Sequence, residues 1–146
     1  MLAALKEAQK AFDIDEVPVG AVIVYQDKII ARGHNLRETK QSVLEHAELV
    51  AIKKANKKIN SWRLEDCDLY VTLEPCPMCA GAIIQSRIKN VYFGAYDPKS
   101  GACGSVLSLF DYRFNHLVHF KGGIMREDCE KIIKSFFQIL RNKSID

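Results

Sequence analysis

Short apolar runs that alternate with helical segments constrain the fold of this chain more than any other feature of its sequence. The runs with strand character are Val17–Tyr25, Lys28–Gly33, Leu69–Leu73, Val91–Ala95 and one near Leu117–Phe120. The segments with helical periodicity are Leu2–Phe12, His46–Ile59, Cys76–Ile88 and a last one that begins near Met125. A hairpin followed by strands that alternate with helices predicts an α/β fold, with one sheet covered by helices on both faces.

Length and composition point to a soluble globular protein. The chain has 146 residues, of which 48% are hydrophobic and 27% are charged, so we expect a single domain over residues 1–146. No apolar segment approaches the length that crosses a bilayer, and Lys6 and Glu7 interrupt the apolar start, so a cytoplasmic protein without a membrane partner is expected. The net charge of +3 is compatible with a polyanionic partner but does not demand one.

Two short stretches carry the residues suited to metal chemistry. Cys76 and Cys79 are three apart, so on one helical turn both sulfurs can meet the same ion. Pro77 is compatible with a first helical position, which makes Cys76 a helix cap where exposed amides favour a thiolate. His46 and Glu48 can share a pocket only if His46 lies at or before the first turn of its helix, because each residue turns by about 100°. We therefore predict two helix starts that face each other.

Three ligands from His46, Cys76 and Cys79 predict a catalytic zinc site. They leave one of the four tetrahedral positions open. A water bound there has its pKa lowered from about 15.7 to near 7, which provides hydroxide at neutral pH. Glu48 is adjacent without being needed as a ligand, so it is the expected catalytic proton shuttle for displacement of an amine from an aromatic ring.

A structural zinc site is the alternative interpretation of the cysteine pair. Such a site needs a fourth ligand, and the candidates are Cys67, Cys103, Cys129 and His34. None of them has a partner at ligand spacing, so each is expected to be a small buried residue or a surface histidine. The combined His-x-Glu and Cys-x-x-Cys pattern, with each half opening a helix, is instead typical of zinc-dependent nucleobase deaminases.

From about Glu16 to Arg141 the sequence resembles the tRNA-specific adenosine deaminases of bacteria, within the cytidine-deaminase superfamily. The resemblance rests on these stretches, beside His46-Ala47-Glu48: Val17-Pro18-Val19-Gly20-Ala21, Gly33-His34-Asn35, Tyr70 to Ala82, Ser86-Arg87-Ile88, Val91 to Ala95, Asp97 to Ala102, Asn115-His116, Phe136-Phe137 and Leu140-Arg141. It implies a three-layer α/β/α fold with a five-stranded mixed sheet. It also implies hydrolytic deamination of adenosine to inosine at the wobble position of a tRNA anticodon loop.

The resemblance also implies roles for individual residues. One Zn²⁺ per subunit would be bound by His46, Cys76 and Cys79, with Glu48 as proton shuttle. The substrate-binding residues would be Asn35, Ala47, Asp97, Lys99 and Phe137, with the tRNA anticodon stem-loop as partner and a homodimer as the assembly. By their local patterns alone, Asn35 and Asp97 are typical turn residues and Phe137 is typical of a core, while the lysines at 53, 54, 57 and 58 indicate a solvated helix face.

Two other functions remain open at this point. A deaminase of the same fold could act on guanine, cytidine or a free nucleotide, and inosine formation in a stem-loop distinguishes it. A non-catalytic, zinc-stabilised RNA-binding module is the second alternative, and Glu48 beside an open metal position argues against it. Tyr96 stands where relatives often carry a basic residue, so the contact with a flanking base is expected to differ here.

Overall fold

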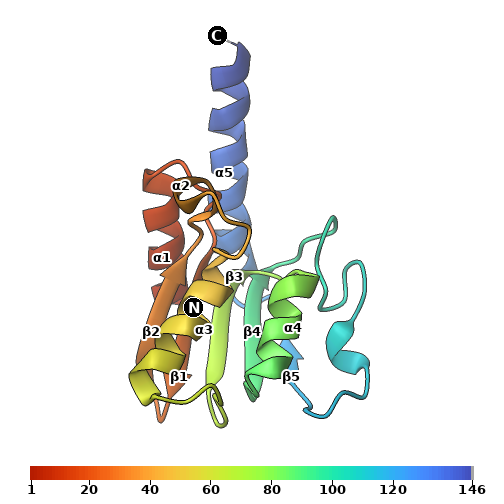
Figure 1. Ribbon diagram of the computed structural model, residues 1–146. Helices are drawn as coiled ribbons and strands as arrows, with labels where there is room; N and C mark the ends of the chain where they lie inside the picture. The colour runs from red at the N-terminus through yellow and green to blue at the C-terminus, as the bar shows by residue number, and fades with distance from the viewer. Residues whose placement is uncertain (146) are drawn as a thin grey trace.

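One mixed sheet organises the computed structural model, which describes residues 1–145 (Figure 1). The strands are β1 (Gly20–Tyr25), β2 (Lys28–His34), β3 (Asp68–Leu73), β4 (Asn90–Ala95) and β5 (His119–Lys121). They form a five-stranded sheet in the order β2-β1-β3-β4-β5. β1 pairs antiparallel with β2 and β3, whereas β3–β4 and β4–β5 are parallel.

Helices cover both faces of this sheet, which confirms the predicted three-layer α/β/α fold. The helices are α1 (Leu2–Asp13), α2 (Arg37–Lys40), α3 (Ala47–Ile59), α4 (Pro77–Gln85) and α5 (Arg126–Ile145), with a 3₁₀ turn, η1 (Leu109–Asp111). α3 and α4 lie side by side on one face, and α1 and α5 pack on the other (Figure 1). α5 extends well beyond the sheet.

The strand directions bring several chain segments to one edge of the sheet. Because β1 runs antiparallel to β2 and β3, its start lies beside the end of β2 and the end of β3. Pairing of Gly20 with His34 and of Ala21 with Val71 sets this alignment. The side-chain hydroxyl of Thr72 accepts a hydrogen bond from the Gly20 N–H at 3.1 Å. This edge, with the starts of α3 and α4, holds the candidate site.

Most predicted elements are present, with shifted ends. β1 begins at Gly20 rather than Val17, because the Val17 carbonyl accepts the Val19 N–H at 2.8 Å in a tight turn. α4 ends at Gln85 rather than Ile88, because Arg87 adopts the left-handed conformation with φ of 66°. β5 lies at His119–Lys121, shifted toward the C-terminus from the predicted run. The four-residue α2 was not predicted, since one turn is too short to show a periodicity.

Two glycines let helices approach the sheet closely. A Cβ atom at Gly33 in β2 would lie 2.6 Å from the Ala47 carbonyl oxygen and 2.7 Å from the Ala51 nitrogen of α3. A Cβ at Gly20 would meet the backbone of α1 at 2.0 Å. Both glycines are therefore required for backbone-to-backbone packing, and Gly33 fixes the position of the start of α3.

Replacing Gly33 with alanine is expected to lower the free energy of unfolding by about 1–3 kcal/mol, because the methyl group would push α3 away from β2. Chemical denaturation measures this. Gly81 in α4 is the control, since a Cβ there meets no atom within 4 Å and alanine favours a helix by about 0.5–1 kcal/mol. Equal stability of the Gly33→Ala protein and wild type would contradict the tight contact.

Along the described chain, no helix combines the length and the apolar character needed to cross a membrane.

Candidate active site

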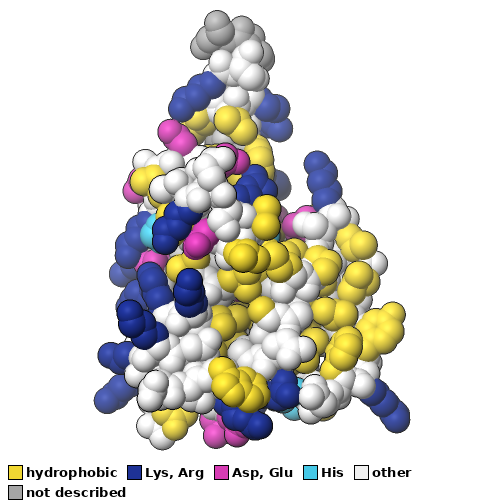
Figure 2. Space-filling model, viewed as in Figure 1, with side chains coloured by type: hydrophobic (Ala, Val, Ile, Leu, Met, Phe, Trp, Pro, Cys, Tyr) yellow, Lys and Arg dark blue, Asp and Glu magenta, His cyan; other side chains and the backbone are white. Residues whose placement is uncertain are grey.

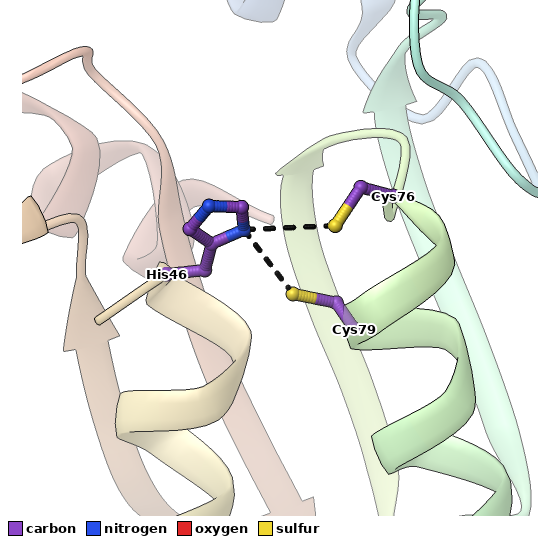
Figure 3. A group of neighbouring side chains, drawn as sticks. All are labelled: His46, Cys76 and Cys79. Atoms are coloured by element: carbon purple, nitrogen blue, oxygen red, sulfur yellow. Dashed lines mark hydrogen bonds between the residues drawn. The ribbon is translucent and has the colours of Figure 1, made fainter. Parts of the chain in front are cut away.

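The predicted metal ligands lie at the facing starts of two helices. His46 is the residue before α3, with an extended backbone (φ −70°, ψ 150°), and Cys76 is the residue before α4 (φ −75°, ψ 173°). Pro77 occupies the first turn of α4, and Cys79 follows within that turn. Figure 3 shows the imidazole and both sulfurs turned toward one another across the gap between the helices. The predicted arrangement is confirmed.

The ligand distances fit a zinc ion. His46 Nδ1 lies 3.6 Å from Cys76 Sγ and 3.4 Å from Cys79 Sγ (Figure 3). A tetrahedral zinc with ordinary bond lengths places nitrogen and sulfur ligands about 3.5 Å apart. The three ligand atoms lie within 4.8 Å of one another, and no fourth His, Cys, Asp or Glu among residues 1–145 belongs to the group. Imidazole and thiolate are the donors that zinc prefers, so the residues fit this metal, with one coordination position left free of protein ligands.

The two thiols differ in their pKa values. A hydrogen bond from Cys79, together with His46, lowers the pKa of Cys76 to about 4 despite its burial. The pKa of Cys79 is raised, because its hydrogen is shared with Cys76 and because it is buried. The hydrogen bond to Cys76 also raises the pKa of His46. Cys76 is thus a thiolate near neutral pH, as a metal ligand must be.

Glu48 lies beside this group but is not one of its ligands. It is in the first turn of α3 and only 4% exposed. Burial, and to a smaller extent the Cys76 sulfur, raise the pKa of Glu48 to about 7, although a backbone hydrogen bond and His46 oppose the shift. A carboxyl group that titrates near the working pH can both accept and donate a proton, which is the property of a general acid–base catalyst.

These residues line a pocket of ≈ 170 Å³. Its lining includes predicted metal ligands, the acid–base candidate and predicted substrate-binding residues: His46, Cys76, Glu48, Asn35, Ala47 and Asp97. The pocket therefore combines a metal group, a buried acid and polar groups at its rim. It is large enough to admit a small planar substrate next to the metal position.

Asn35 and Asp97 line the pocket and also stabilise their own turns. The Asn35 side-chain oxygen accepts the Arg37 N–H at 3.1 Å, and its amide donates to the Val17 carbonyl at 3.3 Å. The Asp97 carboxylate accepts the N–H of Lys99 at 3.1 Å and the hydroxyl of Ser100 at 2.7 Å. Their turn-forming roles, expected from the local pattern, coexist with a position at the pocket.

Lys99 and Phe137 are not among the pocket-lining residues. The Lys99 side chain is exposed on the loop after β4. Phe137 is 40% exposed on α5 and packs edge-on against Phe136, with ring centroids 5.4 Å apart. Any contact that these two residues make with a substrate must involve parts of it outside the pocket, so their roles stay predictions.

The candidates for a fourth ligand lie elsewhere. Cys67, Cys103 and Cys129 are buried free thiols, as expected. His34 is half-buried and not a surface residue, because its Nδ1 atom lies 3.3 Å from the Glu7 carboxylate. None of these four belongs to the metal-binding group among the described residues, so a closed structural site with four protein ligands is not formed.

Sequence reasoning missed Glu74 and Glu16, two buried carboxylates near the pocket. Glu16 accepts the N–H groups of Glu38 at 3.0 Å and Thr39 at 2.8 Å, which anchors the short helix α2. Burial alone would raise the pKa of Glu16, but these hydrogen bonds lower it overall. Glu74 binds the loop after β4 in a similar way. The sequence did offer a signal for Glu74, because an acidic residue directly after a buried strand and before the metal motif indicates a functional position.

The fold and site define a class, the deaminases: residues 1–141 match the family described as MafB19-like deaminase. A tRNA-specific adenosine deaminase from Bacillus subtilis (strain 168) is 51% identical over 98% of this chain and 89% of its own length. A Haemophilus influenzae protein of the same name is 45% identical over 98% of the chain and 84% of its own length. The chain belongs to the tRNA-specific adenosine deaminase family.

Solved structures support the same assignment. A structure from a study of A-to-I editing by tRNA:A34 deaminases superimposes with a TM-score of 0.88 at 41% identity, covering 90% of this chain and 96% of that one. A guanine deaminase from Bacillus subtilis is less similar, with a TM-score of 0.63 and 33% identity over 95% of this chain and 89% of that one. The resemblance inferred from the sequence motifs is confirmed.

Proposed function

We propose that this protein converts the wobble adenosine of a tRNA anticodon loop to inosine by hydrolytic deamination, as a single zinc-dependent domain. The observation that carries the proposal is the buried Glu48, which lines one pocket with His46 and Cys76 beside the group that these two form with Cys79. The tRNA substrate is supported by the names of the relatives at 45% and 51% identity, and the wobble position by the similar structure from the study of A-to-I editing at that position. Because tRNA is the substrate, we place the enzyme in the cytoplasm.

One Zn²⁺ per subunit is the proposed cofactor, held by His46, Cys76 and Cys79. When bound, zinc supplies the Lewis acidity that activates water for attack on the ring carbon that bears the amino group. Glu48 moves the protons. It passes one proton of the attacking water to a ring nitrogen and the other to the departing amino nitrogen. A C–O bond forms and a C–N bond breaks, so that adenosine and water give inosine and ammonia.

The remaining site residues are proposed to bind the substrate. Asn35 and the backbone of Ala47 would hold the edge of the extruded base, since both line the pocket. Asp97 and Lys99 would contact the flanking nucleotides, and Phe137 would contact the anticodon loop beyond the pocket. A loop base can leave its stack for a few kcal/mol, so these contacts suffice to hold it in the site.

The test is inosine formation in an anticodon stem-loop, measured beside free adenosine, cytidine and guanine with zinc quantified in the same sample. We expect turnover of the stem-loop only. Guanine deamination is the second candidate, because a solved guanine deaminase shares 33% identity with this chain. Reaction of free bases without reaction of the stem-loop would refute the tRNA substrate and favour that candidate.

A homodimer is the proposed assembly. Large apolar side chains lie exposed between β4 and β5, and Figure 2 shows hydrophobic side chains gathered over this segment and α4. This apolar patch consists of Val106, Leu107, Tyr112, Phe114 and Leu117. Contiguous exposed apolar surface on a soluble protein commonly marks an interface, and a second copy of the chain would cover it.

Charging the apolar patch is expected to yield a monomer. In the Phe114→Asp, Leu117→Asp double variant, two carboxylates would be buried without partners on association. Light scattering during size-exclusion chromatography measures the mass. The control is Ile139→Asp, Leu140→Asp on α5, where two equally exposed apolar residues lie away from the patch. A dimer that survives the first variant would contradict the proposed interface.

A further inference from the structure

Glu74 is buried, with only 2% of the residue exposed. It lies between the end of β3 and residues 75–76, which lead into α4 and which we call the metal-binding turn. One of its oxygens accepts the Asp97 N–H at 3.0 Å and the Ser105 hydroxyl. The other accepts the N–H of Cys103 at 2.9 Å and of Ser105 at 3.1 Å. All four donors belong to residues 97–105, which we call the pocket loop. A single side chain thus binds both ends of this loop.

The pocket loop has no space to move closer to Glu74 or to slide past it. A Cβ atom at Gly101 would lie 2.3–2.5 Å from the Glu74 carboxyl atoms, so glycine is needed where the loop crosses the carboxylate. The Pro75 carbonyl accepts the Ala102 N–H at 2.8 Å, and the Glu74 N–H donates to the Ala95 carbonyl at 2.9 Å. Backbone and side-chain bonds together fasten the loop to the segment 74–75.

The negative charge of Glu74 strengthens its hydrogen bonds to the pocket loop. Within residues 1–145, no Lys or Arg nitrogen lies within 4.0 Å of its carboxylate. The carboxylate is stabilised by the backbone N–H groups of the loop, and a hydrogen bond to an ionised acceptor is roughly twice as strong as one between neutral groups. A neutral side chain of the same shape would hold the loop less firmly.

Glu74 also joins two walls of the pocket. Two residues after it, Cys76 is a proposed metal ligand, and Asp97 and Ser100 of the pocket loop line the same pocket. Glu74 itself lines the pocket. The Glu74 carboxylate therefore helps to set the distance between the metal group and the polar groups of the loop, together with the backbone bonds of residues 74–75.

We infer that Glu74 is a positioning residue for RNA binding: it holds the pocket loop against the metal-binding turn, so that Asp97 and Lys99 face the nucleotides beside the target base. This inference rests on the proposed tRNA substrate. The metal group and Glu48 lie at the starts of α3 and α4, outside the loop. A loosened loop should therefore weaken substrate binding and leave the chemical step intact.

The first test is Glu74→Gln, assayed for kcat and KM on the anticodon stem-loop. The glutamine amide keeps the shape but turns an N–H₂ group toward a backbone N–H donor, so at least one bond of the tether is lost. Loss of one such bond raises KM by about tenfold if it disorders the loop. We expect kcat and zinc content to stay near the wild-type values. An unchanged KM, or a loss of kcat alone, would overturn the inference.

A general loss of stability must be separated from this effect. Glu7→Gln is the matched control, because Glu7 is also buried and hydrogen-bonded but lies in α1 on the other face of the sheet. It is expected to lower the melting temperature without raising KM. In an Asp97→Ala background, Glu74→Gln should add little to KM, since both changes act through the same loop. Fully additive effects would refute a shared role.

Hydrogen exchange tests the tether without catalysis. In Glu74→Gln the amides of residues 97–105 should exchange faster than in wild type, while the first turns of α3 and α4 should not. Unchanged exchange in the loop would overturn the inference. Should Glu74→Gln fail to fold, Ser105→Ala removes the hydroxyl bond to Glu74 and keeps the backbone N–H of residue 105, and the same readouts apply. A wild-type protein inactive on the stem-loop would refute the proposed substrate, while the exchange result would still decide the tether.

Discussion

Replacing Glu48 with glutamine is expected to lower kcat on the stem-loop by about 10²–10⁴-fold, the usual contribution of a general acid–base group. The amide is nearly the same size, so the pocket and the metal ligands should be unaffected. It cannot carry protons between the water and the base. Zinc content and stem-loop affinity are therefore expected to match those of wild type, which separates a chemical defect from a structural one.

The matched control for this variant is Glu65→Gln. Glu65 is exposed and forms an ion pair with Arg63, two residues before it, so its loss should leave turnover unchanged. Retained turnover in Glu48→Gln would show that another group moves the protons. If wild type itself binds the stem-loop and zinc but never forms inosine, the protein is the non-catalytic RNA-binding module that the sequence left open.

Removing a metal ligand should have the second large effect. Cys79→Ala leaves only His46 and Cys76 to hold the ion, so bound zinc is expected to fall from one per chain to a small fraction and activity to background. Metal analysis and the stem-loop assay on the same sample measure this. Treatment of wild type with a chelator should abolish activity, and added Zn²⁺ should restore it.

Cys67→Ala controls for the loss of a buried thiol, because Cys67 and Cys79 are both completely buried. Both variants lose similar packing, so a lower melting temperature in Cys79→Ala than in Cys67→Ala reports the contribution of the metal. An active Cys79→Ala protein with a full complement of zinc would contradict the proposed ligand set.

The helix starts of the site could be predicted from the sequence because they follow from local geometry. His46 and Glu48 can share a pocket only across a helix boundary, and Pro77 marks the other boundary. The three layers also follow from the alternation of elements, whereas the strand order was not predicted. These features depend on residues close together in the chain, which is why periodicity and spacing predict them.

The loop after β4 could not be predicted in the same way. Its conformation depends on Glu74, which lies 23 to 31 residues away in the sequence. The left-handed Arg87 that ends α4 was not predicted either, because such a position is usually marked by glycine or asparagine. The run predicted near Leu117–Phe120 overlaps β5, but the strand itself lies at His119–Lys121, where the residues pair with β4.

The close contact at Gly33 has a consequence for folding. The residues on either side of it are Arg32 and His34, whose side chains could not fit where the Gly33 Cα faces Ala47 and Ala51. A hairpin slipped by one residue would place one of them under α3 and prevent the helix from docking. We therefore expect α3 to dock only when β1 and β2 are correctly aligned. Because His46 stands at the start of α3, the metal group can then form only in correctly aligned chains.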